Sequence, residues 1–142
     1  MDSTQKTVIT VHVKVNAPIR KIWKYWTTPE HITQWNNASD DWHSPYAKND
    51  LQVGKRFDYR MEAKDKSMGF DFTGVYTKIS KHKLIEYTLD DDRKVSINFS
   101  KADNWTEVTE SFEAETTNSN ELQRAGWQAI LDNFKKYTET HE

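Results

Sequence analysis

Residues 118–137 read NSNELQRAGWQAILDNFKKY and predict a long amphipathic helix near the end of the chain. One apolar stripe runs along it at positions i, i+3, i+4, i+7 and i+10, formed by Trp127, Ile130, Leu131, Phe134 and Tyr137. The preceding part of the chain is typical of short alternating strands, so we expect this stripe to pack against a sheet. A curved sheet that grips a helix tends to leave a cavity between the two.

The start and the middle of this helix carry two further signals. Asn118 with Glu121 three residues later is similar to a capping box, so we expect the helix to begin there. Gly126 lies mid-helix, where glycine costs about 1 kcal/mol relative to alanine. Either close approach to a neighbouring element or room for a ligand would explain this glycine. We expect close approach.

The N-terminal third predicts one strand followed by two short helices. Residues 7–15 alternate with period two, which is typical of a strand with one buried face. Pro18 and Pro29 stand where a first helical turn begins, because proline is tolerated there. The second helix is expected to end near Trp35. The face of the strand that we expect to be buried consists of Ile9, Val11, Val13 and Val15.

A meander of about six strands is expected between these helices and the C-terminal one. Turn-forming residues separate its segments, which favours antiparallel pairing. Residues 38–54 predict a loop and an irregular edge strand. A bulge at Gly74 is expected to bend one strand, which leaves the facing of Tyr76 open. The regular strands are expected at residues 56–62, 68–79, 84–89, 95–99 and 105–114.

Composition excludes several classes of protein. The 142 residues fit one domain spanning positions 1–142, and the net charge of -2 with a pI near 6.2 argues against a nucleic-acid binder. The chain has no cysteine, which excludes disulfides and thiolate chemistry and fits a reducing cytoplasm. Residues 1–6 show no signal peptide, and no window approaches the ~18 apolar residues of a membrane span. We therefore expect a cytoplasmic protein without a membrane span.

Five stretches, in this order, resemble the helix-grip superfamily of pollen-allergen-like and StAR-related lipid-transfer domains (SRPBCC). They are most similar to the branch of the activator of heat-shock-protein ATPase. The resemblance implies an α+β fold with a seven-stranded curved antiparallel sheet wrapped around the C-terminal helix, and two short helices after the first strand. The stretches are residues 15–19 (VNAPI) with Ile22 and Trp23, 28–32 (TPEHI) with Trp35, 53–57 (VGKRF), 68–76 (MGFDFTGVY) and 126–134 (GWQAILDNF).

Aromatic residues, 13% of the chain, are expected to line much of the cavity. Apolar walls with a few polar anchors are the usual composition of a small-molecule site. The alternative is that these side chains only fill the core, because protein interiors pack at nearly crystalline density. The candidate cavity-lining residues are Trp26, Trp35, Phe57, Tyr59, Met61, Phe70, Phe72, Tyr87, Trp127, Ile130 and Phe134.

The sequence offers little support for catalysis or for a metal site. None of its five histidines has the spacing of metal ligands, and the family that it resembles has no shared catalytic motif to carry over. His43, in a loop, is the best histidine candidate for a general base, but such loop histidines are more often solvated. Alternation places almost all ionisable side chains of the strands outside. We therefore expect no catalytic residue, no metal and no cofactor.

Three functions follow from these observations. The leading one is binding of a small apolar or amphipathic ligand without catalysis. The second is a co-chaperone-like module that regulates a heat-shock-protein ATPase. The third is a cyclase, aromatase or hydrolase on the same fold, which would require an ionisable side chain facing the cavity. A monomer and a homodimer are both compatible, because exposed Trp35, Trp42 or Trp105 would either cover a partner or cap an edge of the core.

Overall fold

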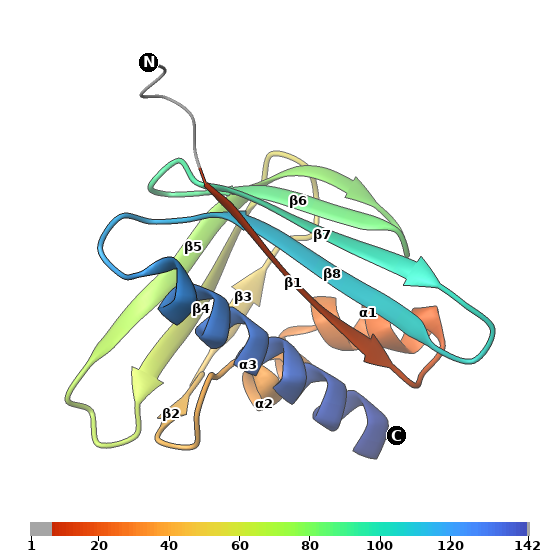
Figure 1. Ribbon diagram of the computed structural model, residues 1–142, viewed down its shortest axis with the longest axis horizontal. Coiled ribbons are helices and arrows are strands. Elements are labelled where there is room, and N and C mark those ends of the chain that lie inside the picture. The colour runs from red at the N-terminus through yellow and green to blue at the C-terminus, as the bar shows by residue number, and fades with distance from the viewer. Residues whose placement is uncertain (1–6, 142) are drawn as a thin grey trace.

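The computed structural model describes residues 7–141, which form a curved antiparallel sheet, one long helix and two short ones (Figure 1). The prediction that residues 1–6 carry no signal peptide lies outside this range. The elements are β1 (Val8–Val15), α1 (Ile19–Thr27), α2 (Pro29–Trp35), β2 (Trp42–His43), β3 (Ala47–Asn49), β4 (Arg56–Ala63), β5 (Gly69–Ser80), β6 (Leu84–Leu89), β7 (Lys94–Lys101), β8 (Thr106–Glu113) and α3 (Asn120–Thr140).

The sheet has the order β1-β8-β7-β6-β5-β4-β2, and β3 also pairs with β4. Because β2 and β3 lie on the same edge of β4, they form one interrupted edge strand. The interruption is bridged by two hydrogen bonds: the Ser44 hydroxyl donates to the Arg60 carbonyl at 2.8 Å, and the Arg60 amide donates to the Tyr46 carbonyl at 3.1 Å. The predicted α+β helix-grip fold with seven strand positions is confirmed.

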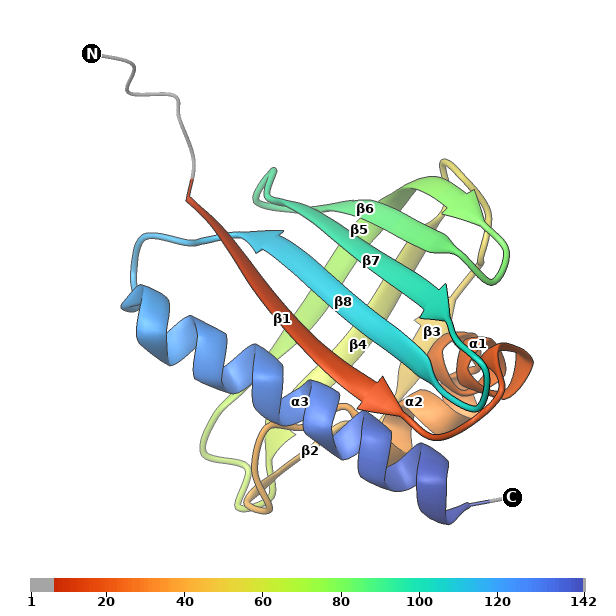
Figure 2. The same cartoon turned by 45° about the vertical axis from the view of Figure 1, so that its right-hand side comes forward.

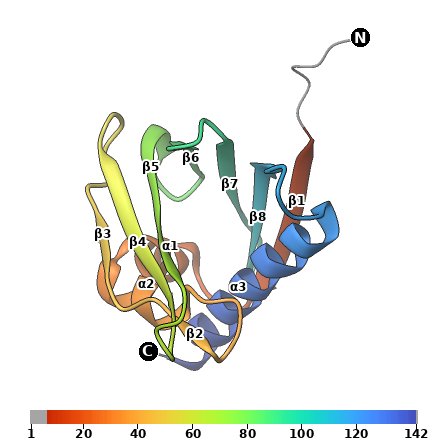
Figure 3. The same ribbon diagram turned by 90° about the vertical axis from the view of Figure 1, so that its left-hand side faces the viewer.

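The concave face of the sheet carries the apolar residues that alternation predicts. On β1 the buried residues are Ile9, Val11, Val13 and Val15, as expected. Figures 2 and 3 show how the sheet curls, with β3, β4 and β5 forming one wall and β8 and β1 the other. Helix α3 runs along β1, where the Arg124 and Gln128 side chains donate to the carbonyls of Thr10 and His12, each at 3.0 Å. These bonds satisfy carbonyls on an otherwise open sheet edge.

Helix α3 begins one residue later than the predicted capping box. Ser119 is the N-cap, and its hydroxyl accepts a hydrogen bond from the Leu122 amide at 3.1 Å. The prediction of a cap at Asn118 is wrong, because the Asn118 amide and side chain bind Glu115 instead. The apolar stripe is confirmed: Leu131 and Phe134 are buried, and the other three residues are partly buried against the core.

Strand β5 is bulged, but not at the predicted position. Gly74 pairs in register with Phe57 and Leu89, and the register shifts between Tyr76 and Lys78. Gly74 serves close packing instead, because a Cβ there would lie 2.7 Å from the Thr88 carbonyl oxygen. Since the strand is regular up to Tyr76, this tyrosine faces inward and is only 3% exposed.

Trp35 does not offer a surface for a partner. Its side chain is 4% exposed, and the indole Nε1 donates to the Tyr25 carbonyl at 3.0 Å. Trp42 and Trp105 are partly exposed. Of the three tryptophans that we expected to be exposed, only these two could still contact a partner.

Candidate functional site

A cavity of about 400 Å³ lies between the concave face of the sheet and the N-terminal half of α3. Helices α1 and α2 border one end of it, and the loop between β8 and α3 borders the other. Its lining residues are Trp26, Thr27, Trp35, Asn36, Tyr59, Met61, Phe70, Phe72, Tyr76, Ile85, Tyr87, Arg93, Glu110, Glu115, Asn118, Leu122, Gln123, Gly126, Trp127 and Ile130.

Nine of the eleven candidate residues from the sequence border this cavity, and two do not. Phe57 and Phe134 are buried in the core, behind the cavity wall. Ligand contact by any of them stays a prediction. The nine that border the cavity are Trp26, Trp35, Tyr59, Met61, Phe70, Phe72, Tyr87, Trp127 and Ile130.

The aromatic wall is held in place by ring–ring packing. Trp127 stacks on Phe112 with ring centroids 3.8 Å apart and an interplanar angle of 10°, and its edge meets Phe72 at 6.0 Å. Trp26 and Trp35 pack against each other and both rest on Phe134. Because Trp127 is stacked closely on Phe112 and the other rings lie at centroid distances typical of favourable aromatic pairs, the wall is preformed.

Three tyrosine hydroxyls bring polar groups to the cavity. The hydroxyls of Tyr59 and Tyr76 lie 3.4 Å apart, and the Asn49 amide donates to the Tyr76 hydroxyl at 3.4 Å. Burial raises the pKa of Tyr59, Tyr76 and Tyr87 above the usual value of a tyrosine. All three therefore stay neutral and act as hydrogen-bonding groups in an apolar surrounding.

Glu110 places a buried carboxyl group on the concave face of the sheet. It pairs with Val11 on β1 and with Ile97 on β7, and it is 6% exposed. Burial raises the pKa of Glu110 to about 8. Within residues 7–141, its carboxyl group has no hydrogen bond or ion pair.

Sequence reasoning missed Glu110, although a signal was present. It lies between Val108 and Phe112, which were both assigned to the inward face of the strand at residues 105–114. Strict period two places the residue between them on that same face. The expectation that ionisable strand residues point outward therefore fails at this position.

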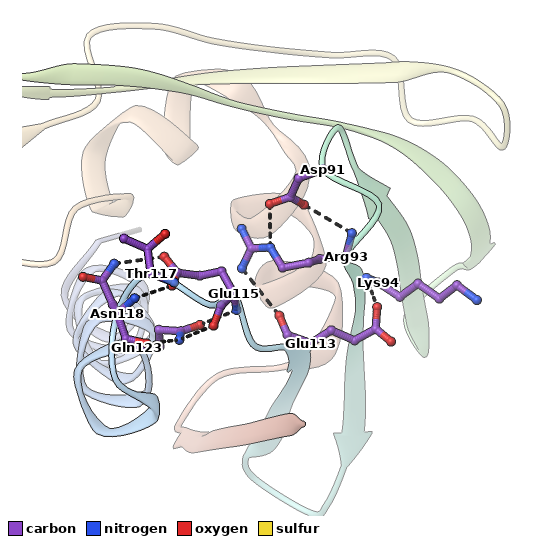
Figure 4. Close-up of polar contacts among 8 residues, drawn as sticks. All are labelled: Asp91, Arg93, Lys94, Glu113, Glu115, Thr117, Asn118 and Gln123. Atoms are coloured by element: carbon purple, nitrogen blue, oxygen red, sulfur yellow. Dashed lines mark hydrogen bonds and ion pairs between the residues drawn. The ribbon is translucent and has the colours of Figure 1, made fainter. Parts of the chain in front are cut away.

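A second polar group, which we call the polar rim, consists of Arg93, Glu115, Asn118 and Gln123 (Figure 4). The Glu115 carboxylate accepts from the amides of Thr117 and Asn118 and from the Asn118 side chain, at 2.8, 2.6 and 2.9 Å. These bonds, first that from the Asn118 amide, lower the pKa of Glu115.

The other members of the polar rim are also bonded within the chain. The Gln123 side chain accepts from the Glu115 amide at 2.9 Å and donates to the Glu115 and Asn118 carbonyls. Arg93 donates to Asp91 at 2.8 Å. The sequence could not predict this group, because its bonds join a loop, a hairpin and α3. Unlike the carboxyl of Glu110, the charged groups of Arg93 and Glu115 have bonding partners within the chain.

Comparison with known proteins identifies the family. Residues 16–139 match the family described as Activator of Hsp90 ATPase homolog 1-like protein. The chain belongs to this family. The AHSA1-like protein of Aeromonas hydrophila is 40% identical, with 96% of this chain and 98% of that one covered and a TM-score of 0.87. No curated protein matches the chain.

Two further solved structures extend the comparison. A protein from Cytophaga hutchinsonii is 52% identical over 94% of this chain and 96% of its own, with a TM-score of 0.81. A protein from Nitrosomonas europaea is 15% identical over 95% and 96% of the two chains, with a TM-score of 0.80. The latter shows that the fold persists where the sequences have diverged.

In this member of the AHSA1-like family, Gly126 leaves open space on α3. A Cβ built at Gly126 would meet no atom within 4 Å, and the residue borders the cavity. The expectation that this glycine allows close packing is wrong, because no neighbouring element approaches it. The other explanation, room beside the helix, agrees with the geometry.

The histidines of this family member lie away from the cavity. The His31 Nδ1 forms a 2.7 Å hydrogen bond with the Tyr137 hydroxyl, and its ring stacks on Tyr25 at 4.0 Å, so it joins α2 to α3. His43 lies 3.8 Å from Glu62 and is partly exposed. Among the described residues, no group of three His, Cys, Asp or Glu side chains is arranged to hold a metal ion.

No helix in the part of the chain that the structure describes is both long enough and apolar enough to cross a membrane.

Proposed function

We propose that this protein binds a small apolar or amphipathic molecule in the cavity between the sheet and α3. The observation that carries the proposal is the cavity of about 400 Å³, which has aromatic walls and polar groups gathered mainly at its rim and at Glu110. Small-molecule sites usually have this composition, with volumes from about 300 to 1,000 Å³. The nine candidate residues that border the cavity are proposed as ligand contacts, and Phe57 and Phe134 as supports behind them.

Native mass spectrometry of the freshly purified protein tests whether it carries a ligand. An excess mass that disappears on unfolding would support the proposal, and denaturing extraction would then give the ligand class. Binding of the neutral dye Nile red provides a second measurement that needs no resident ligand.

The control for this dye measurement is a pair of neighbouring substitutions on α3. Gly126→Phe should fill the open space beside Gly126 and reduce Nile red affinity at least tenfold. Ala125→Phe adds the same ring at an exposed position that does not border the cavity, and should leave the affinity unchanged. Equal dye binding by wild type and Gly126→Phe, with no excess mass, would refute the proposal.

The family match favours a second candidate function. The family is named after an activator of the Hsp90 ATPase, so we propose as the alternative a co-chaperone-like module that acts on a heat-shock-protein ATPase. The chaperone's ATPase rate, measured with and without this protein at micromolar concentrations, tests it. An unchanged rate together with an empty pull-down would count against this alternative.

Catalysis of the cyclase, aromatase or hydrolase kind has less support. Glu110 supplies the inward-facing ionisable group that such a reaction requires, but no tyrosine hydroxyl within the described residues is hydrogen-bonded to it. We therefore propose binding without catalysis. We also propose that the chain acts as a single domain, in the cytoplasm, where its lack of cysteine fits the reducing conditions. A monomer and a homodimer both fit this function.

A further inference from the structure

The Glu110 carboxyl is the one polar group on the concave face, within the described residues, that combines deep burial with an ionisable charge and no partner. Its sheet neighbours Val11 and Ile97 are apolar, so they satisfy none of its hydrogen-bonding capacity. A buried carboxyl without partners costs stability, and native proteins rarely keep one without a functional reason.

No cationic side chain within residues 7–141 forms an ion pair with this carboxyl. The charged or titratable groups that share the cavity are Tyr59, Tyr76, Tyr87, Arg93 and Glu115. Arg93 is paired with Asp91, and its charge acts on Tyr87 and Glu115. Burial raises the pKa of Glu110, as expected for a carboxyl without a positive partner. From α3, the cavity receives only uncharged side chains, among them Gln123 and Trp127.

The walls around this carboxyl are suited to a positive charge. Aromatic rings attract cations through their electron-rich faces, most strongly where water is excluded. Trp127 and Tyr87 line the same cavity as Glu110, and the negative charge of Glu110 acts on the Tyr87 hydroxyl. An ammonium group would therefore find both a carboxylate and aromatic faces, and an apolar body would fill the remaining space.

We propose that the cavity selects an amine, with the ammonium group of the ligand paired to the Glu110 carboxylate and its apolar body against the aromatic walls. This inference rests on the proposed function and specifies its ligand class. The competing class is a neutral ligand whose oxygen accepts a hydrogen bond from the protonated Glu110 carboxyl.

The two classes differ in how their affinity depends on pH. An amine needs Glu110 ionised, so one proton leaves the protein when the amine binds below the pKa of about 8. Amine affinity should then rise about tenfold per pH unit from pH 6 to pH 8 and become constant above it. A neutral acceptor needs Glu110 protonated, so its affinity should fall above pH 8. No other group in the cavity changes charge between pH 6 and 8, because the tyrosine pKa values are raised and that of Glu115 is lowered.

The test uses tryptamine and tryptophol, which share an indole and a two-carbon chain but end in an ammonium and a hydroxyl group. Both are titrated against Nile red bound to wild type and to Glu110→Gln, from pH 6 to pH 9. We expect tryptamine affinity for wild type to follow the tenfold rise per pH unit. In Glu110→Gln it should be independent of pH and at least tenfold weaker at pH 8. Tryptophol should bind weakly and nearly equally to both proteins.

Each of the following results would overturn the proposal. If tryptophol binds as tightly as tryptamine at pH 8, no carboxylate–ammonium pair contributes to binding. The same conclusion follows if Glu110→Gln leaves the affinity for tryptamine unchanged. If the affinity for tryptophol falls above pH 8 in wild type but not in Glu110→Gln, the ligand belongs to the neutral class that accepts a hydrogen bond from protonated Glu110. Failure of tryptamine to displace Nile red, while Gly126→Phe still abolishes dye binding, would reject the amine and leave the proposed binding function intact. Dye binding that Gly126→Phe does not change would reject both.

Discussion

Replacing Glu110 by glutamine should make the protein more stable at neutral pH. Burial raises the pKa of this carboxyl from 4.5 to about 8, so the folded protein holds a proton that the unfolded chain releases. The stability that comes from this protonation is fully present below pH 4.5 and is lost as the pH rises through 8. Glutamine is similar in shape and never ionises, so the variant should not show this loss.

The size of the effect follows from the pKa difference. Each unit corresponds to about 1.4 kcal/mol, so the wild type should lose about 3 kcal/mol between pH 4.5 and pH 7 and about 4 kcal/mol by pH 8. Relative to wild type, Glu110→Gln should gain about 3 kcal/mol in the free energy of unfolding between pH 4.5 and pH 7. For a chain of this length, that difference is on the order of 10 °C in Tm.

Urea denaturation at pH 4.5, 6, 7 and 8.5 measures this difference directly. Glu107→Gln, on the same strand but facing outward, is the matched control, because its ion pair with His12 is largely exposed and contributes little. Its stability should follow that of wild type at every pH. Parallel stability curves for Glu110→Gln and wild type would refute the burial argument, since a solvated carboxyl would not couple folding to pH.

Three further substitutions test the packing around the cavity, each by urea denaturation. Gly126→Ala should stabilise the protein by about 1 kcal/mol, because helix propensity improves and the added methyl meets nothing; a loss would show that the space is not open. Gly74→Ala should destabilise it by about 2 kcal/mol or more, because the added Cβ would lie 2.7 Å from the Thr88 carbonyl oxygen, and a neutral result would contradict this contact. Trp127→Ala should cost about 3–5 kcal/mol through lost stacking on Phe112 and should also weaken Nile red binding; unchanged affinity in the folded variant would exclude Trp127 from the site.

Periodicity was enough to predict the layers of this fold. The alternation of β1 predicts that one face of the strand is buried, and the helical stripe predicts that Leu131 and Phe134 face the core. The structure shows both burial patterns. Periodicity did not predict features that depend on strand pairing or on hydrogen bonds between side chains and backbone. The bulge of β5 falls after Tyr76 because of its pairing with β6, and the cap of α3 is Ser119 because Asn118 binds Glu115.

The same periodicity predicted which residues face inward, but not which of them border the cavity and which fill the core. Alternation identifies an inward-facing ring without saying whether space remains beside it. Tyr59 and Phe57 share one face of β4, yet only Tyr59 borders the cavity. The ring of Phe57 is packed among those of Tyr59, Tyr76 and Tyr87, at centroid distances of 5.0, 5.3 and 4.7 Å, and no local pattern predicts these contacts.

Glu110 and Gly126 oppose stability for different reasons, and this favours a binding role for the space that they border. An ionisable group in a buried strand position weakens folding at neutral pH, and a glycine in the middle of α3 weakens the helix. A larger side chain at position 126 would fill space that is now open. Proteins that give up stability in this way commonly do so where binding requires it. If Glu110→Gln stabilises the fold at neutral pH and also weakens tryptamine binding, the loss of stability and the selectivity for amines will have been traced to the same carboxyl.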